Sequence, residues 1–126
     1  MLAVGALAVS CDLKPTERPG PHHQGDVRDI LGLPWYGLIA HPVCRRLANS
    51  GVRWLHERPE YMADVQPAAE FFMLFDRAEH IQRRAVENPI QHKYARAIVG
   101  RRAEQYVQPH HFGSPFQKAT GLWLHG

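Results

Sequence analysis

The chain has 126 residues, of which 44% are hydrophobic and 21% charged, a composition typical of one globular domain. Its two cysteines exclude a disulfide framework, and no apolar run is long enough for a membrane-spanning helix. The net charge of +3 is compatible with nucleic-acid binding without requiring it. We therefore expect a single domain over residues 1–126, in a reducing cytoplasm and without a membrane partner.

Apolar, β-prone runs alternate with helical patterns along the chain. The expected strands are residues 7–10, 25–27, 38–40, 82–87, 105–107 and 121–124, and the expected helices are 27–31, 62–78 and 92–99. Residues 14–25 are rich in Pro, Gly and His and are expected to form a loop, and Gly100 is expected to end the last helix. In helix 62–78 a core-facing stripe at helical spacing is formed by Val65, Ala68, Ala69, Phe72, Leu74 and Phe75. This alternation predicts an α/β fold with a mainly parallel sheet covered on both faces.

Two short motifs follow strands of this sheet. One is His41-Pro42-Val43-Cys44, and the other is Glu87-Asn88-Pro89. Loops that leave the carboxyl ends of neighbouring parallel strands converge on one crevice. The pattern therefore predicts a cysteine nucleophile beside a carboxylic acid, the pair required for attack on an electron-poor ring.

Each motif also has a purely structural interpretation. Spacing alone favours Cys44 as a small buried core residue, the commoner place for a lone cysteine. Asn88 could cap the following helix, with Pro89 at the first helical position. The two interpretations of Glu87-Asn88-Pro89 are compatible, because a cap could fix the loop that aims Glu87.

Other polar residues leave two alternatives open. Asp12 and Asp26 each follow an early strand, where a carboxylate accepts hydrogen bonds from a nucleoside or serves a turn. The arginine doublets at 45–46, 83–84 and 101–102 indicate solvated faces or phosphate contacts. The nine histidines include two adjacent pairs but no metal-binding spacing, so no metal is expected.

Taken together, these segments resemble the DNA (cytosine-5) methyltransferases, and most closely a compact phage-type and bacterial subgroup. The similarity covers nearly the whole chain. It runs through Ser10-Cys11-Asp12-Leu13, Gly25-Asp26-Val27, Ile39-Ala40-His41-Pro42-Val43-Cys44, Gly51-Val52-Arg53-Trp54-Leu55-His56-Glu57, Val86-Glu87-Asn88-Pro89 and Phe112-Gly113-Ser114-Pro115-Phe116-Gln117-Lys118-Ala119-Thr120.

The resemblance implies a Rossmann-like sheet that binds S-adenosylmethionine and acts on a cytosine flipped out of duplex DNA. Cys44 falls on the family's nucleophile, which attacks C6, and Glu87 on the acid, which protonates N3. Asp12 falls on the acidic position near the cofactor ribose and Asp26 on that near the adenine. The implied cofactor-binding residues also include Pro42. Lys118 falls on the first arginine of a late motif and completes the implied catalytic set.

The chain departs from the family pattern at several positions. Val43 replaces the second proline of Pro-Pro-Cys, Phe116 replaces a glutamine, and Thr120 replaces the second late arginine. The chain begins after the family's first strand and Gly-rich loop. We therefore expect a partial domain, with an upstream segment or a partner chain supplying that strand. The alternatives are a non-catalytic remnant or DNA-binding module and a histidine-dependent metal hydrolase.

Overall fold

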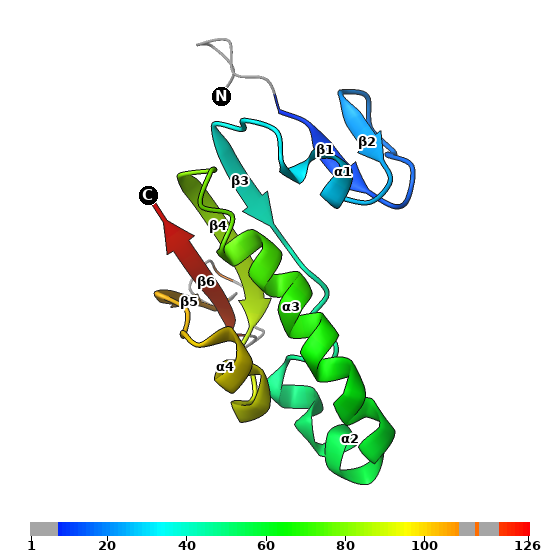
Figure 1. Cartoon of the computed structure of the whole chain (residues 1–126), viewed down its shortest axis with the longest axis vertical. Coiled ribbons are helices and arrows are strands. Elements are labelled where there is room, and N and C mark those ends of the chain that lie inside the picture. Colours follow the sequence, from blue (N-terminus) through cyan, green and yellow to red (C-terminus); the bar gives the residue numbers. More distant parts are fainter. Residues whose placement is uncertain (1–7, 109–112, 114–118) are drawn as a thin grey trace. The chain divides into compact units, whose positions relative to one another are not determined.

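A computed structural model describes residues 8–108, 113 and 119–126 (Figure 1). The chain divides into two compact units, residues 1–34 and 35–126. The first unit holds a two-stranded sheet and the second a four-stranded sheet. The fold is therefore a mixed α/β arrangement, and each unit is described by itself.

The first unit pairs β1 (Ser10–Asp12) with β2 (His22–Gln24) in parallel, and α1 (Arg28–Leu31) follows. The strand predicted at 7–10 begins three residues later, and the strand predicted at 25–27 lies three residues earlier. His22 lies in a strand although its sequence neighbours favour a loop, because the backbone pairs with Ser10 of β1. The Nδ1 atom of His22 also accepts a hydrogen bond from the Ser10 hydroxyl at 2.7 Å. Among the described residues of this unit only Leu31 is buried. Little apolar packing therefore holds this unit together.

The second unit contains β3 (Gly37–Ala40), β4 (Arg83–Pro89), β5 (Gln105–Val107) and β6 (Thr120–His125) in the order β3-β4-β6-β5. The β3–β4 pair is parallel, and β6 is antiparallel to both of its neighbours. The strands β3, β4 and β5 thus run in one direction. The last strand, β6, lies between β4 and β5 and runs in the opposite direction. The prediction of a mainly parallel sheet was wrong for the pairing, because consecutive strands β5 and β6 pair antiparallel, which requires no crossover helix.

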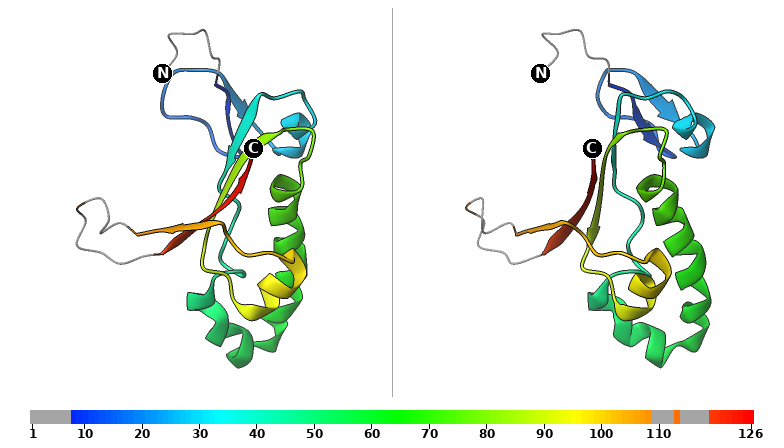
Figure 2. Two further views of the ribbon diagram at one scale, coloured as in Figure 1. Left: turned by 90° about the vertical axis from the view of Figure 1, so that its left-hand side faces the viewer. Right: turned by 60° about the vertical axis from the view of Figure 1, so that its left-hand side comes forward.

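The helices of the second unit lie on one side of its sheet (Figure 2). They are η1 (Asn49–Gly51), α2 (Val52–Glu57), η2 (Pro59–Asp64), α3 (Val65–Asp76) and α4 (Lys93–Val99). The prediction of helices on both faces is wrong for the described part of this unit. No helix among the described residues is long and apolar enough to cross a membrane.

The core lies between α3, α4 and the sheet. Phe72 of α3 meets Trp123 of β6 edge to face, with ring centroids 4.9 Å apart, and both are buried. The predicted stripe is confirmed for Val65, Ala69, Phe72 and Phe75. Leu74 is 37% exposed, so its inclusion was wrong. The first turns of the predicted helix form the 3-10 helix η2, and Gly100 ends α4 with φ +83°, as predicted.

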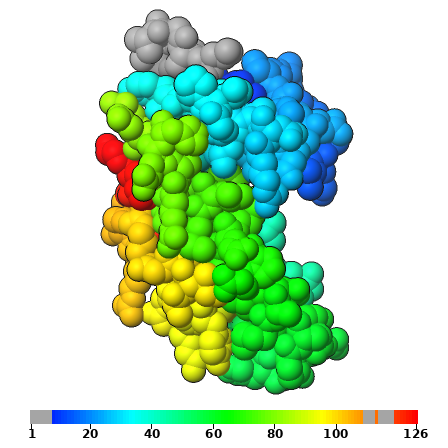
Figure 3. All heavy atoms as spheres, viewed as in Figure 1, coloured from blue at the N-terminus to red at the C-terminus, as the bar shows by residue number. Residues whose placement is uncertain are grey.

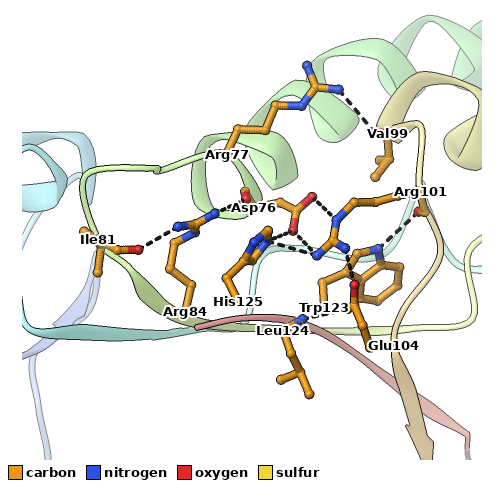
Figure 4. Close-up of polar contacts among 10 residues, drawn as sticks. All are labelled: Asp76, Arg77, Ile81, Arg84, Val99, Arg101, Glu104, Trp123, Leu124 and His125. Carbon is orange, nitrogen blue, oxygen red and sulfur yellow. Dashed lines mark hydrogen bonds and ion pairs between the residues drawn. The ribbon is translucent and has the colours of Figure 1, made fainter.

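A buried charge network joins the end of α3 to the end of β6 (Figure 4). The Asp76 carboxylate is 2% exposed and accepts two hydrogen bonds of 3.0 Å from Arg101. His125 Nε2 lies 2.8 Å from Asp76 Oδ1, and Arg101 also pairs with Glu104. Burial alone would raise the pKa of Asp76, but the hydrogen bonds and charges of Arg101 and His125 hold it below its usual value.

Replacing Asp76 with Asn is expected to destabilise the protein by about 2–3 kcal/mol, because the hydrogen bonds from Arg101 and His125 lose their charged acceptor. Urea unfolding measures this loss, with Asp64→Asn as control. Asp64 forms an exposed ion pair with Arg46, which is worth about 0–1 kcal/mol. An equal effect of both substitutions would contradict a special role for Asp76.

The same network predicts a loss of stability in acid. The folded pKa of Asp76 is depressed, so its contribution is complete above the unfolded pKa of about 3.9 and is lost as pH falls through the folded value. Wild-type stability should therefore fall over this acidic range more steeply than that of Asp76→Asn. Parallel stability curves for the two proteins would contradict the prediction.

Candidate functional site

The two motifs are brought side by side by the parallel pairing of β3 and β4. Ala40 is the partner of Val86, so the next residues, His41 and Glu87, lie together at the carboxyl ends of β3 and β4. His41 Nδ1 donates to Glu87 Oε2 at 2.9 Å. Glu87 lies within β4 rather than after it, and its side chain is 30% exposed. The predicted neighbourhood of the two motif-bearing strands is thus present, with His41 as an unpredicted partner.

The cysteine-bearing loop is fixed to the end of β4 by the neighbour of Glu87. Asn88 is 1% exposed, and its Nδ2 donates to Pro42 O at 3.0 Å. Further along, Asn49 N donates to Ile90 O at 2.7 Å. Since these bonds join residues far apart in sequence, the loop conformation depends on β4 being in place.

Cys44 begins a turn in this loop, and its carbonyl accepts from the backbone N–H groups of Leu47 and Ala48 at 2.9 Å. Its thiol is free and the residue is partly exposed. Cys44 is therefore not a buried core cysteine, and a partly exposed thiol is what a nucleophile requires.

The helix after β4 is capped by His92 and not by Asn88. His92 Nδ1 accepts from Ala95 N at 3.0 Å, and its Nε2 donates to Arg46 O at 2.7 Å. Pro89 is paired with Thr120 in the sheet, so the predicted cap at Asn88 and Pro89 was wrong. The strand extends further because β6 pairs with it through Pro89. Histidine is outside the usual capping residues, so the sequence held no signal for this cap.

The first unit holds two of the predicted cofactor residues. Asp12 is paired with Gln24, and Asp26 follows two residues later, so both carboxylates lie at the carboxyl ends of parallel strands. Asp12 Oδ1 accepts from Lys14 N at 3.1 Å and is otherwise exposed. Arg28 donates its backbone N–H to Asp26 Oδ1 at 2.8 Å and pairs with Oδ2 at 3.0 Å. That backbone bond, above all, lowers the pKa of Asp26. Both aspartates therefore serve turns and are exposed acceptors.

The remaining predicted residues differ in position. Pro42 lies in the second unit, is buried, and offers its carbonyl to Asn88. Lys118 and Phe116 lie outside the described residues. Thr120, at the position of the second late arginine, begins β6 opposite Pro89. It therefore lies at the same end of the sheet as Glu87.

The two adjacent histidines of the first unit bind different partners. His22 bonds Ser10 and Lys14, whereas His23 bonds Asp29 at 3.1 Å. No group of three His, Cys, Asp or Glu side chains among the described residues could hold a metal ion. The two motifs contribute a thiol, a carboxylate and an imidazole.

Comparison with known proteins adds no relative. No protein-family model, no curated protein and no solved structure matches the chain. The motifs and the contacts that join them are therefore the basis for a functional proposal.

Proposed function

We propose that this chain is a cytoplasmic DNA (cytosine-5) methyltransferase domain of the compact phage-type subgroup, with a Rossmann-like S-adenosylmethionine-dependent sheet. The observation that supports the proposal most strongly is the contact between the two motifs. The cysteine loop follows β3, the carboxylate lies on the adjacent parallel strand β4, and two side-chain bonds join them, His41 to Glu87 and Asn88 to Pro42.

The reacting residues have complementary roles in this proposal. The Cys44 thiolate attacks C6 of a cytosine flipped out of the duplex, and Glu87 donates a proton to N3, so the ring accepts the electron pair and C5 becomes nucleophilic. S-adenosylmethionine supplies an electrophilic methyl group to C5. Solvent water takes the C5 proton, the Cys44 sulfur leaves as a thiolate by β-elimination, and N3 returns its proton to the Glu87 carboxylate. Because His41 bonds Oε2 of Glu87, Oε1 is left for the base.

The cofactor residues of the proposal are Asp12 for the ribose hydroxyls, Asp26 for the adenine amine, and Pro42. Two exposed carboxylates at one edge of a parallel pair fit the hydroxyls and amine of a nucleoside. Asp26 would share its oxygens with Arg28. Lys118 takes the place of the first late arginine.

One observation favours the alternative of a non-catalytic remnant or DNA-binding module. Only Leu31 is buried among the described residues of the unit that carries Asp12 and Asp26. Since a cofactor site requires side chains locked by packing, this sparse core is a reason to measure cofactor binding separately.

The deciding experiment measures transfer of tritiated methyl groups from S-adenosylmethionine to duplex DNA, by this chain and by an N-terminally extended version. We expect label in cytosine-containing DNA with at least one of them. A duplex in which 5-methylcytosine replaces every cytosine is the control and should take up no label. Absence of transfer by both versions, with retained DNA binding, would favour the remnant.

A further inference from the structure

A groove with an excess of positive charge lies on the surface of the second unit beside α4. Figure 3 shows this helix and the segment after it, in yellow and orange, at the surface. The groove is lined by Lys93, Arg96, Ala97, Gly100, Arg101 and Arg102. Four of these six residues are basic and none is acidic, so the groove is a candidate site for an anion.

One of the four cations is already neutralised. Arg101 is bound to the buried carboxylate of Asp76 and to Glu104, so it belongs to the network that holds the fold. Within the described residues, Lys93, Arg96 and Arg102 form no ion pair with a carboxylate, whereas Arg28 and Arg46 do. Three positive charges in this groove are therefore without a counter-charge from the described chain.

The backbone arranges these three cations as a short row. Lys93 and Arg96 are three residues apart and share one face of α4, a helix about 10 Å long. Gly100 then adopts φ +83°, and Arg102 lines the same groove after this turn. Duplex DNA carries one phosphate charge per about 3.4 Å along each strand, so such a row can face consecutive phosphates.

The row begins one residue after a contact with the cysteine-bearing loop. His92, the cap of α4, donates to Arg46 O in the cysteine-bearing loop, and Lys93 is the next residue. A flipped base stays attached to its strand, so a duplex bound at this loop brings its backbone to the unit that carries Lys93.

We propose that Lys93, Arg96 and Arg102 form a phosphate-binding groove for the backbone of duplex DNA next to the flipped base. The identity of the polyanion depends on the function proposed above. The contacts are charge contacts to phosphates, so they add affinity without sequence preference. The two arginines at 101–102 thus have different roles. Arg101 stabilises the fold through Asp76 and Glu104, and Arg102 binds the phosphate.

The test measures binding of a fluorescent duplex to the full chain by anisotropy over a range of salt concentrations. The triple variant Lys93→Gln/Arg96→Gln/Arg102→Gln should bind at least about 10-fold more weakly at 0.1 M salt. Its slope of log K against log salt should be shallower by about 2–3, since each phosphate contact contributes about 0.9. The control Lys14→Gln/Arg18→Gln/Arg83→Gln removes three exposed charges elsewhere and should leave the slope unchanged.

Each of the following outcomes would contradict the proposed binding of DNA phosphates in the groove. Equal losses in both triple variants would mean that net charge alone matters, and an unchanged slope would mean that the groove does not contact phosphates. Loss of binding to phosphatidylserine vesicles without loss of DNA binding would assign the groove to a lipid surface. If the triple variant unfolds, Arg96→Gln and Arg102→Gln are measured singly, and each should reduce the slope by about 0.9.

The outcomes for the groove and for the proposed function are distinguishable. A chain that transfers no methyl group but binds DNA through these cations would support the groove and refute the enzyme. A chain that methylates DNA with an unchanged salt slope in the triple variant would support the enzyme and refute the groove.

Discussion

Replacing Cys44 with serine is expected to reduce methyl transfer below detection. A serine hydroxyl is a far weaker nucleophile near neutral pH than a cysteine thiolate, and no other group in the proposed reaction can take its place. The measurement is tritium transfer to DNA by whichever version of the chain is active. Full activity of Cys44→Ser would remove Cys44 from the mechanism.

The second cysteine is a matched control for this substitution. Cys11 lies in β1 of the first unit, and its Sγ contacts Gly25 O at 3.8 Å. Burial, followed by the nearby charges of Asp12, Asp29 and Asp26, raises the pKa of the Cys11 thiol. It therefore stays protonated near neutral pH and is a poor nucleophile. Cys11→Ser should retain methyl transfer.

A covalent trap gives an independent test of the same residue. DNA containing 5-fluorocytosine should form a stable adduct, because fluorine at C5 cannot leave as a proton does and β-elimination is blocked. Mass spectrometry of the digested adduct should place it on Cys44, both in the wild type and in Cys11→Ser. An adduct on Cys11 would contradict the proposed site.

Replacing Glu87 with glutamine is expected to slow methyl transfer by about 10²–10⁴-fold, the usual contribution of a positioned general acid. The amide keeps the shape of the side chain and a polar partner for His41, but it has no proton to transfer to N3. Single-turnover rates at saturating DNA measure the loss, and anisotropy should show nearly unchanged DNA affinity.

The fold makes this substitution a clean test. Since His92 caps α4, Glu87→Gln does not disturb the start of that helix. Glu60→Gln, in the exposed 3-10 helix η2, is the control and should leave the rate unchanged. Collapse of DNA binding in Glu87→Gln, with normal turnover at saturation, would assign Glu87 to binding and not to proton transfer.

Local patterns predicted the elements whose cause is local. The predicted strands at 38–40, 105–107 and 121–124 agree with the observed strands to within one residue at each end. The apolar stripe of α3 and the glycine that ends α4 were also predicted. Each depends on side-chain period or on the conformational freedom of glycine, which short stretches of sequence contain. The first unit was less well predicted, because its three-residue strands are too short to show a period.

The sequence by itself also placed Cys44 after one strand and Glu87 at the end of a neighbouring strand. Only the tertiary structure decided the antiparallel insertion of β6, the His41–Glu87 bond, the hold of Asn88 on Pro42 and the Asp76 network. The physical reason is range. Side-chain period and turn chemistry act over a few residues, whereas these contacts join positions 25 to 49 residues apart and exist only after the strands have paired.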